Sequence, residues 1–164
     1  MSPIIRMHAV RAATLAAIVL LAGCGPAKKS VFPPTLSLQE VHAKAGGTWH
    51  VTLRVRNNSY GSMAFDRFQG TLRVGQLGGV LLDAKIDQDI PSFAADVTQV
   101  DILPTPDMSK ALAELAAKGS AGTLPYTIEG HITGTPEQED KPRSFDVRGK
   151  DWLSPVPGIP DTYR

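Results

Sequence analysis

The sequence is poor in residues that stabilise or bind through special chemistry. Its 164 residues include one cysteine, Cys24, so no disulfide can form within the chain. Aromatic residues make up only 6% of the chain, and the formal net charge is +1, with no basic stripe that would suit a phosphate backbone. These shortages exclude a disulfide framework and argue against a nucleic-acid partner.

Signatures of common catalytic and metal sites are missing as well. The serines within residues 57–61 and 118–122 lack the first glycine of a nucleophile elbow, and neither S-x-x-K nor H-E-x-x-H occurs. His42, His50 and His131 are far apart in the sequence, and each falls in or beside an expected strand. We interpret them as outward-facing polar residues rather than as metal ligands. The sequence therefore predicts a non-enzymatic protein with no catalytic residue, no metal and no diffusible cofactor.

The N-terminus has a basic segment followed by an apolar one. Two arginines and a histidine precede residues 12–21, an uncharged and mostly aliphatic run that is too short to span a bilayer. This order is typical of a signal peptide. The run ends in Leu21, Ala22, Gly23 and Cys24, a box that resembles the lipobox of bacterial lipoproteins.

The lipobox resemblance implies a covalent lipid anchor. Residues 1–23 would be removed as the signal peptide, and Cys24 would become the first mature residue, acylated on its sulfur and amino group. Each buried methylene contributes about 0.8 kcal/mol, so stable anchoring needs more than one chain. Gly25 stands where lipoproteins retained at the inner membrane commonly carry aspartate, which implies the outer membrane of a bacterial envelope, facing the periplasm. The alternative is that Cys24 is an inert buried thiol or ends an ordinary signal.

The mature chain divides into a tether, one domain and a tail. Residues 24–34 contain three prolines and two lysines without periodicity, which is typical of a flexible membrane tether. Residues 35–153 hold the periodic patterns of a folded domain, and the Pro-rich residues 154–164 are expected to form a surface tail. Without residues 1–23 the chain has 15 basic and 16 acidic residues, which again gives no reason to expect nucleic-acid binding.

Alternation of apolar and polar residues predicts about seven strands. From Trp49 to Val55 every odd position is apolar and every even position is polar, as in a half-buried strand. The same period of two marks strong segments at 68–74 and 124–132, and weaker ones at 35–43, 79–85, 97–103 and 143–148. The glycine-rich stretch 75–79 joins two of these strands, so it predicts a hairpin turn rather than a phosphate-binding loop.

One segment, residues 107–118, has the composition of an α-helix. It is rich in strong helix formers, Thr105 or Asp107 can cap its start, and Gly119 can end it. Many strands with one late helix indicate a mainly β fold, an immunoglobulin- or fibronectin-like antiparallel β-sandwich.

A strand, a turn and a returning strand in residues 50–83 provide a second resemblance. Asn57 ends the first strand, and Asn58 and Ser59 follow it in the turn. This arrangement resembles the core of the late-embryogenesis-abundant (LEA) type 2 family, also described as the water stress and hypersensitive response (WHy) domain. Members have Asn-Pro-Asn at this turn, so Asn58 and Ser59 replace the proline and the second asparagine.

Tyr126 and Gly130 extend the resemblance, because their segment looks like the family's Pro-Tyr-x-x-x-Gly strand; the similarity spans residues 36–147. It implies a folded protein linked to desiccation and water stress, with membranes or proteins as clients. We interpret Asn57, Tyr126 and Gly130 as structural positions. The competing hypothesis is an envelope module that binds a protein or lipid partner through a sheet edge or apolar cleft. The sequence gives no indication of an oligomeric state.

Overall fold

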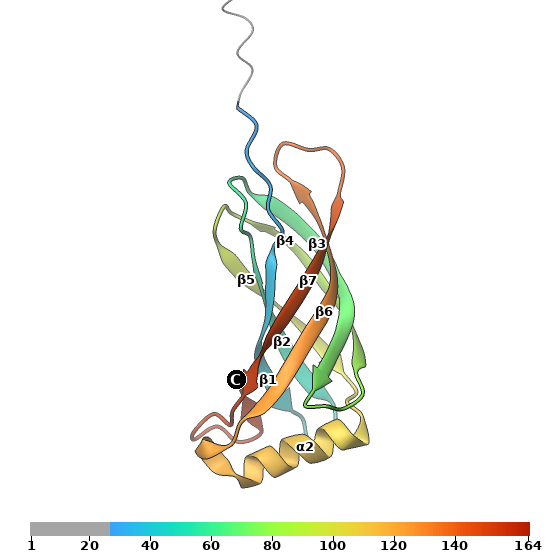
Figure 1. Ribbon diagram of the computed structural model, residues 1–164, viewed down its shortest axis with the longest axis vertical. Helices are drawn as coiled ribbons and strands as arrows, with labels where there is room; N and C mark the ends of the chain where they lie inside the picture. Colours follow the sequence, from blue (N-terminus) through green and yellow to red (C-terminus); the bar gives the residue numbers. More distant parts are fainter. Residues whose placement is uncertain (1–26) are drawn as a thin grey trace, which may run out of the picture.

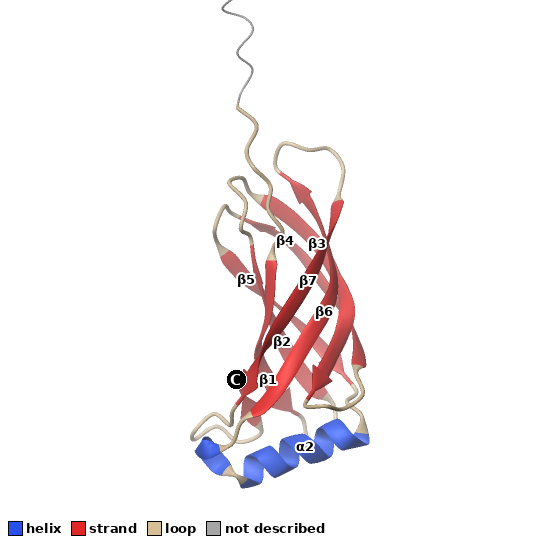
Figure 2. Ribbon diagram, viewed as in Figure 1, coloured by secondary structure: helices blue, strands red, loops and turns tan. Residues whose placement is uncertain are grey.

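A computed structural model describes residues 27–164, so Cys24 and the remainder of the lipobox lie outside the described residues. The described chain forms two antiparallel four-stranded sheets, one α-helix and a short 3-10 helix, η1 (Gly119–Ala121) (Figure 2). The strands are β1 (Thr35–Ala43), β2 (Trp49–Arg56), β3 (Met63–Val74), β4 (Val80–Ile90), β5 (Ala95–Ile102), β6 (Leu124–Pro136), β7 (Arg143–Leu153) and β8 (Thr162–Tyr163). The mainly β sandwich predicted from the sequence is confirmed.

The two sheets pack face to face and also meet at their edges. One sheet has the order β5-β2-β1-β8 and the other β4-β3-β6-β7. At one edge the Thr98 hydroxyl of β5 donates to the carbonyl oxygen of Lys85 in β4, with 2.7 Å between the oxygens. At the other edge, a Cβ on Gly149 of β7 would lie 2.5 Å from the carbonyl oxygen of Leu36 in β1. The two sheets therefore approach each other closely along both edges of the sandwich.

The core follows the alternation seen in the sequence where strands are regular. The four apolar side chains of β2, namely Trp49, Val51, Leu53 and Val55, are all buried. In β3 the pattern breaks, because Phe65 and Phe68 both point inward across a bulge in the pairing with β6. The bulge explains why alternation predicted only the second half of this strand.

Helix α2 (Pro106–Ala117) closes one end of the sandwich (Figure 1). The hydroxyl of Thr105 accepts a hydrogen bond from the Met108 amide, at 3.2 Å between oxygen and nitrogen, so Thr105 is the N-cap. Met108, Leu112 and Leu115 are buried against the sheets. Beyond the helix, Gly119 has φ +62°, a conformation that glycine adopts without strain.

The segment predicted as a Pro-rich tail folds back onto the sandwich. Within residues 154–164, Thr162 and Tyr163 are buried and form β8, which pairs with Val41 and His42 at the outer edge of β1. Two residues are too few to show a period of two, and the prolines around them indicated only a loop. The open edge of β1 supplies backbone groups that hold this short strand.

The end opposite α2, which we call the loop end, consists of residues 57–62, 91–94 and 137–142. Figure 1 shows the N-terminal segment joining the domain there, while the C-terminus lies towards the helix end. Among the described residues, no helix combines the length and apolar character needed to cross a membrane.

Candidate functional site

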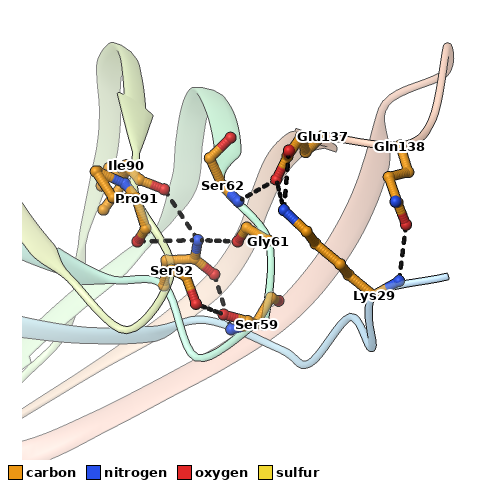
Figure 3. A network of polar contacts seen from close by, with 10 residues as sticks. Lys29, Ser59, Gly61, Ser62, Ile90, Pro91, Ser92, Glu137 and Gln138 are labelled. Atoms are coloured by element: carbon orange, nitrogen blue, oxygen red, sulfur yellow. Dashed lines mark hydrogen bonds and ion pairs between the residues drawn. The ribbon is translucent and has the colours of Figure 1, made fainter. Parts of the chain in front are cut away.

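Asn57 lies at the centre of a polar network in the loop end, and Figure 3 labels its partners Ser59, Gly61 and Ile90. The side chain of Asn57 is fully buried, and its Nδ2 donates to the carbonyl oxygens of Gly61 and Ile90, each at 2.9 Å. Its Oδ1 accepts from the Ser59 amide at 2.9 Å, and its own amide donates to the carbonyl oxygen of Ala94. One residue therefore ties residues 57–62 to the loop between β4 and β5.

Asn58 and Ser59 fasten the N-terminal segment to the same end. The Nδ2 of Asn58 donates to the Pro33 carbonyl oxygen at 2.9 Å and to the Thr35 hydroxyl at 2.8 Å. The hydroxyl of Ser59 accepts from the Phe32 amide at 2.9 Å and donates to the Phe32 carbonyl oxygen at 3.1 Å. Both residues of the altered turn thus bind the chain that leads towards Cys24.

Lys29 is the outermost described residue of this segment that is hydrogen-bonded to the domain, and Lys28 Nζ lies 3.8 Å from Glu139 Oε1. The Lys29 amide donates to Gln138 Oε1 at 2.7 Å, and the Lys29 Nζ lies 2.7 Å from Glu137 Oε2 (Figure 3). The hydrogen bond from Lys29, helped by the amide of Ser62, lowers the pKa of Glu137 from its ordinary value. Although the sequence indicated a flexible tether over residues 24–34, its part from Lys29 onward is bound to the domain.

Three exposed aromatic side chains meet at the loop end, and we call them the aromatic cluster: Phe32, Tyr60 and Phe93. They are 46%, 59% and 51% exposed. The ring centroids of Tyr60 and Phe93 are 5.0 Å apart in an edge-to-face arrangement, and those of Phe32 and Tyr60 are 6.2 Å apart. Phe93 has φ +58°, which is rare for a bulky side chain. No pattern in the sequence singles out these residues.

Tyr126 and Gly130 lie on β6, away from the loop-end network. The Tyr126 hydroxyl crosses to the other sheet, accepting from the Leu38 amide at 3.1 Å and donating to the Leu38 carbonyl oxygen at 3.3 Å. Gly130 lies opposite Gly70 of β3, where the two backbones approach closely. Neither residue contacts Asn57 in a common site.

Replacing Tyr126 with phenylalanine is expected to destabilise the protein by about 1–2 kcal/mol, because the buried backbone groups of Leu38 lose their partner. Burial raises the pKa of the Tyr126 hydroxyl. Above about pH 10 the unfolded chain ionises first, so wild-type stability falls as pH rises through this range. Urea midpoints between about pH 7 and 11 should therefore fall less steeply for Tyr126→Phe. The exposed Tyr60→Phe is the control, and an equal alkaline loss in Tyr126→Phe and wild type would contradict the assignment.

The three histidines form separate pairs. His42 Nδ1 lies 3.1 Å from the Thr162 hydroxyl. In the other two pairs, His50 Nδ1 and His131 Nδ1 each lie 2.6 Å from a carboxylate oxygen, belonging to Asp101 and Asp146 respectively. His42 and His50 are neighbours across β1 and β2, whereas His131 is on the other sheet. Residues 27–164 contain no group of three or more metal-ligating side chains.

A hollow of ≈ 290 Å³ lies between α2 and the β1–β8 edge, away from the loop end. Its walls are largely apolar, with Trp49, Leu112 and Tyr163 contributed by three different elements. Asp161 is the only acidic residue in its lining. The hollow therefore offers an apolar surface rather than a set of converging polar groups.

Comparisons with known proteins give likenesses of fold only. No family model matches the chain, and no curated protein is similar to it in sequence. A solved structure described as a putative late embryogenesis abundant (LEA) protein, At2g46140.1, has a TM-score of 0.41 and 14% identity over 75% of this chain and 72% of that chain. AT1g01470 from Arabidopsis thaliana has a TM-score of 0.44 and 9% identity over 81% and 84%. A protein from Archaeoglobus fulgidus has a TM-score of 0.36 and 7% identity over 77% and 100%.

Proposed function

We propose that this protein is a non-enzymatic lipoprotein of a bacterial envelope, sorted to the outer membrane and anchored through acylated Cys24, with a LEA type 2-like domain that protects membranes or proteins during water loss. The observation that carries the proposal is the attachment of the N-terminal segment at Lys29. The lipobox supplies the anchor, and the fold supplies a rigid body placed close to it.

The chain between the anchor and the domain is short. Only residues 25–28 separate Cys24 from Lys29, and at about 3.3–3.6 Å per residue this stretch spans at most about 18 Å. The loop end therefore faces the membrane, and α2 lies at the far end of the sandwich. Such a short connection suits a protein that acts at the membrane surface rather than one that reaches distant partners.

The charged surface of the sheets suits a protein that must stay folded as water is withdrawn. Glu129 pairs with Arg73 and with Arg148 across three strands, the latter at 2.7 Å between oxygen and nitrogen. Arg164 pairs with Glu40 at 2.6 Å. Exposed pairs contribute little in water, but the attraction between charges grows as the surrounding dielectric constant falls. Charges that already have partners need no rearrangement on drying.

The proposal is tested by complementing a deletion strain with wild-type protein or with Cys24→Ser. Cys24→Ser is expected to abolish palmitate labelling, release the protein from the membrane fraction and reduce survival after drying to that of the deletion strain. Ser30→Ala, a small change in the same segment, should leave all three readouts unchanged. Unchanged labelling of Cys24→Ser would overturn the anchor, and a deletion strain that survives drying as well as wild type would overturn the protective role.

A further inference from the structure

We propose that the aromatic cluster of Phe32, Tyr60 and Phe93 is a membrane-contact site that inserts into the interface of the bilayer holding the acyl anchor. The inference rests on the proposed anchoring at Cys24 and goes beyond it. The anchor alone would leave the domain free to rotate on its short connection. A second contact, made by the fold itself, would fix the long axis of the sandwich relative to the membrane.

The cluster has the composition of an interfacial contact. Its three rings come from three segments that are far apart in the sequence and meet at one end of the fold. Aromatic rings exposed together mark interaction surfaces, and tyrosine is enriched where a membrane meets water because its body is apolar and its hydroxyl is polar. Each ring is roughly half exposed, so the apolar surface is available without unfolding.

The backbone at Phe93 indicates that this aromatic is placed for function. Its φ of +58° lies in the left-handed region, which glycine and asparagine adopt readily and which strains a bulky residue. The Ala94 amide donates to the Pro91 carbonyl oxygen, and the Ala94 carbonyl oxygen in turn accepts from the Asn57 amide, so the turn is held in this shape. An exposed phenylalanine at a strained loop tip brings no core packing that would offset the strain.

The surface around the cluster could enter the interface without burying charge. The three segments that carry the rings, residues 30–34, 57–61 and 91–94, contain no aspartate, glutamate, lysine or arginine. The adjoining loop, residues 137–142, is charged: Glu137 pairs with Lys29 and Glu139 with Arg143, and Asp140 and Lys141 are exposed. Because insertion of an unpaired charge is strongly unfavourable, the uncharged surface around the three rings, and not loop 137–142, is the part of the loop end suited to contact lipid.

The short chain between the anchor and the domain favours lipid, rather than protein, as the partner of the aromatic cluster. Cys24 is at most about 18 Å of chain from Lys29, so the loop end and the bilayer surface are close together. A small folded domain is about 30 Å across, too wide to lie between them. A protein partner could reach the sides of the sandwich or α2, but the aromatic cluster faces the membrane.

The test uses the full-length, lipidated protein in vesicles of phosphatidylethanolamine and phosphatidylglycerol that contain a brominated phospholipid. Tyr60→Trp places a fluorescent indole in the cluster. The emission of this indole should shift to the blue, and the brominated phospholipid should quench it about twofold. The reason is that interfacial side chains reach about 5–10 Å into the boundary between headgroups and acyl chains. The native tryptophans are the internal control: Trp49 is buried, and Trp152 is 62% exposed at the α2 end of β7. Wild-type emission should be unquenched.

Matched variants distinguish a loss of the lipid contact from a loss of folding. In the Tyr60→Trp background, Phe32→Ser with Phe93→Asn should remove the lipid quenching, whereas Phe93→Tyr should preserve it. Phe93→Asn relieves the strained torsion, so the thermal midpoint of the serine and asparagine variant should not fall sharply. A loss of quenching that occurred only with unfolding would count against the proposal.

The remaining outcomes distinguish a failure of the proposed lipid contact from a failure of the proposed anchoring. Mass spectrometry of the same sample shows whether Cys24 is acylated, and an unmodified Cys24 would contradict the proposed anchoring. Acylated Tyr60→Trp protein whose introduced indole is quenched by acrylamide from water but not by brominated lipid would overturn the cluster and leave the anchor standing. Shielding of the introduced indole from both quenchers would mean that protein covers the cluster, which also overturns the lipid contact.

Discussion

Asn57→Asp should destabilise the protein by about 3–5 kcal/mol, because it leaves a buried charge without a partner of opposite sign. The carboxylate could still accept from the Ser59 amide, but it could not donate to the carbonyl oxygens of Gly61 and Ile90 that the Asn57 amide reaches at 2.9 Å. Thermal unfolding followed by circular dichroism should show a midpoint about 10 °C or more below wild type. The loss should shrink as pH falls, since protonation removes the charge and restores one donor.

Asn58→Asp provides the matched control for this prediction. Its side chain is only partly buried and binds the Pro33 carbonyl oxygen and the Thr35 hydroxyl near the solvent. Solvent can replace these bonds, so the expected loss is about 1 kcal/mol or less. Equal midpoints for Asn57→Asp and Asn58→Asp would show that the buried amide does not hold the loop end together.

Much of the fold could be predicted from the sequence because regular strands repeat every two residues. The segment 35–43 coincides with β1, and the alternation from Trp49 to Val55 falls within β2. Irregular strands were harder to predict. The bulge after Phe65 changes which side chains point inward. The expected strand 79–85 stops short of Asp87, whose φ of +52° lies within β4. Local periodicity does not reveal such interruptions.

The loop end could be predicted only in part. Asn57 is visible in the sequence because it ends a clear strand, and the resemblance to a known turn motif drew attention to it. Its partner Ile90 and the docking point of Lys29 depend on tertiary contacts between segments far apart in the chain. Phe32 and Phe93 sit in two separate loops with no shared pattern. The sequence gives a weaker indication of these two residues than of Asn57, namely that the loops around them contain no charged residue.

Gly130→Ala should prevent normal pairing of β3 with β6. A Cβ at this position would lie 2.2 Å from the Gln69 carbonyl oxygen and 2.5 Å from the Gly70 Cα, and backbone atoms in mid-sheet cannot move aside as a flexible side chain can. A Cβ at Gly70 would likewise lie 2.3 Å from the Glu129 carbonyl oxygen. Two glycines face each other because neither strand has space for a side chain there. We expect a loss of roughly 3 kcal/mol or more.

Gly78→Ala separates this steric effect from the general effect of replacing a glycine. Gly78 lies in the turn between β3 and β4, where a Cβ would have no neighbour within 4 Å, so its substitution should change stability by no more than about 0.5 kcal/mol. Denaturant unfolding compares the two variants. If Gly130→Ala is too unstable to purify, the soluble yield of each variant, expressed in parallel, gives the same comparison. Equal stability or yield would contradict the close approach, whereas a selective loss in Gly130→Ala would show that the β3–β6 spacing depends on a residue without a side chain.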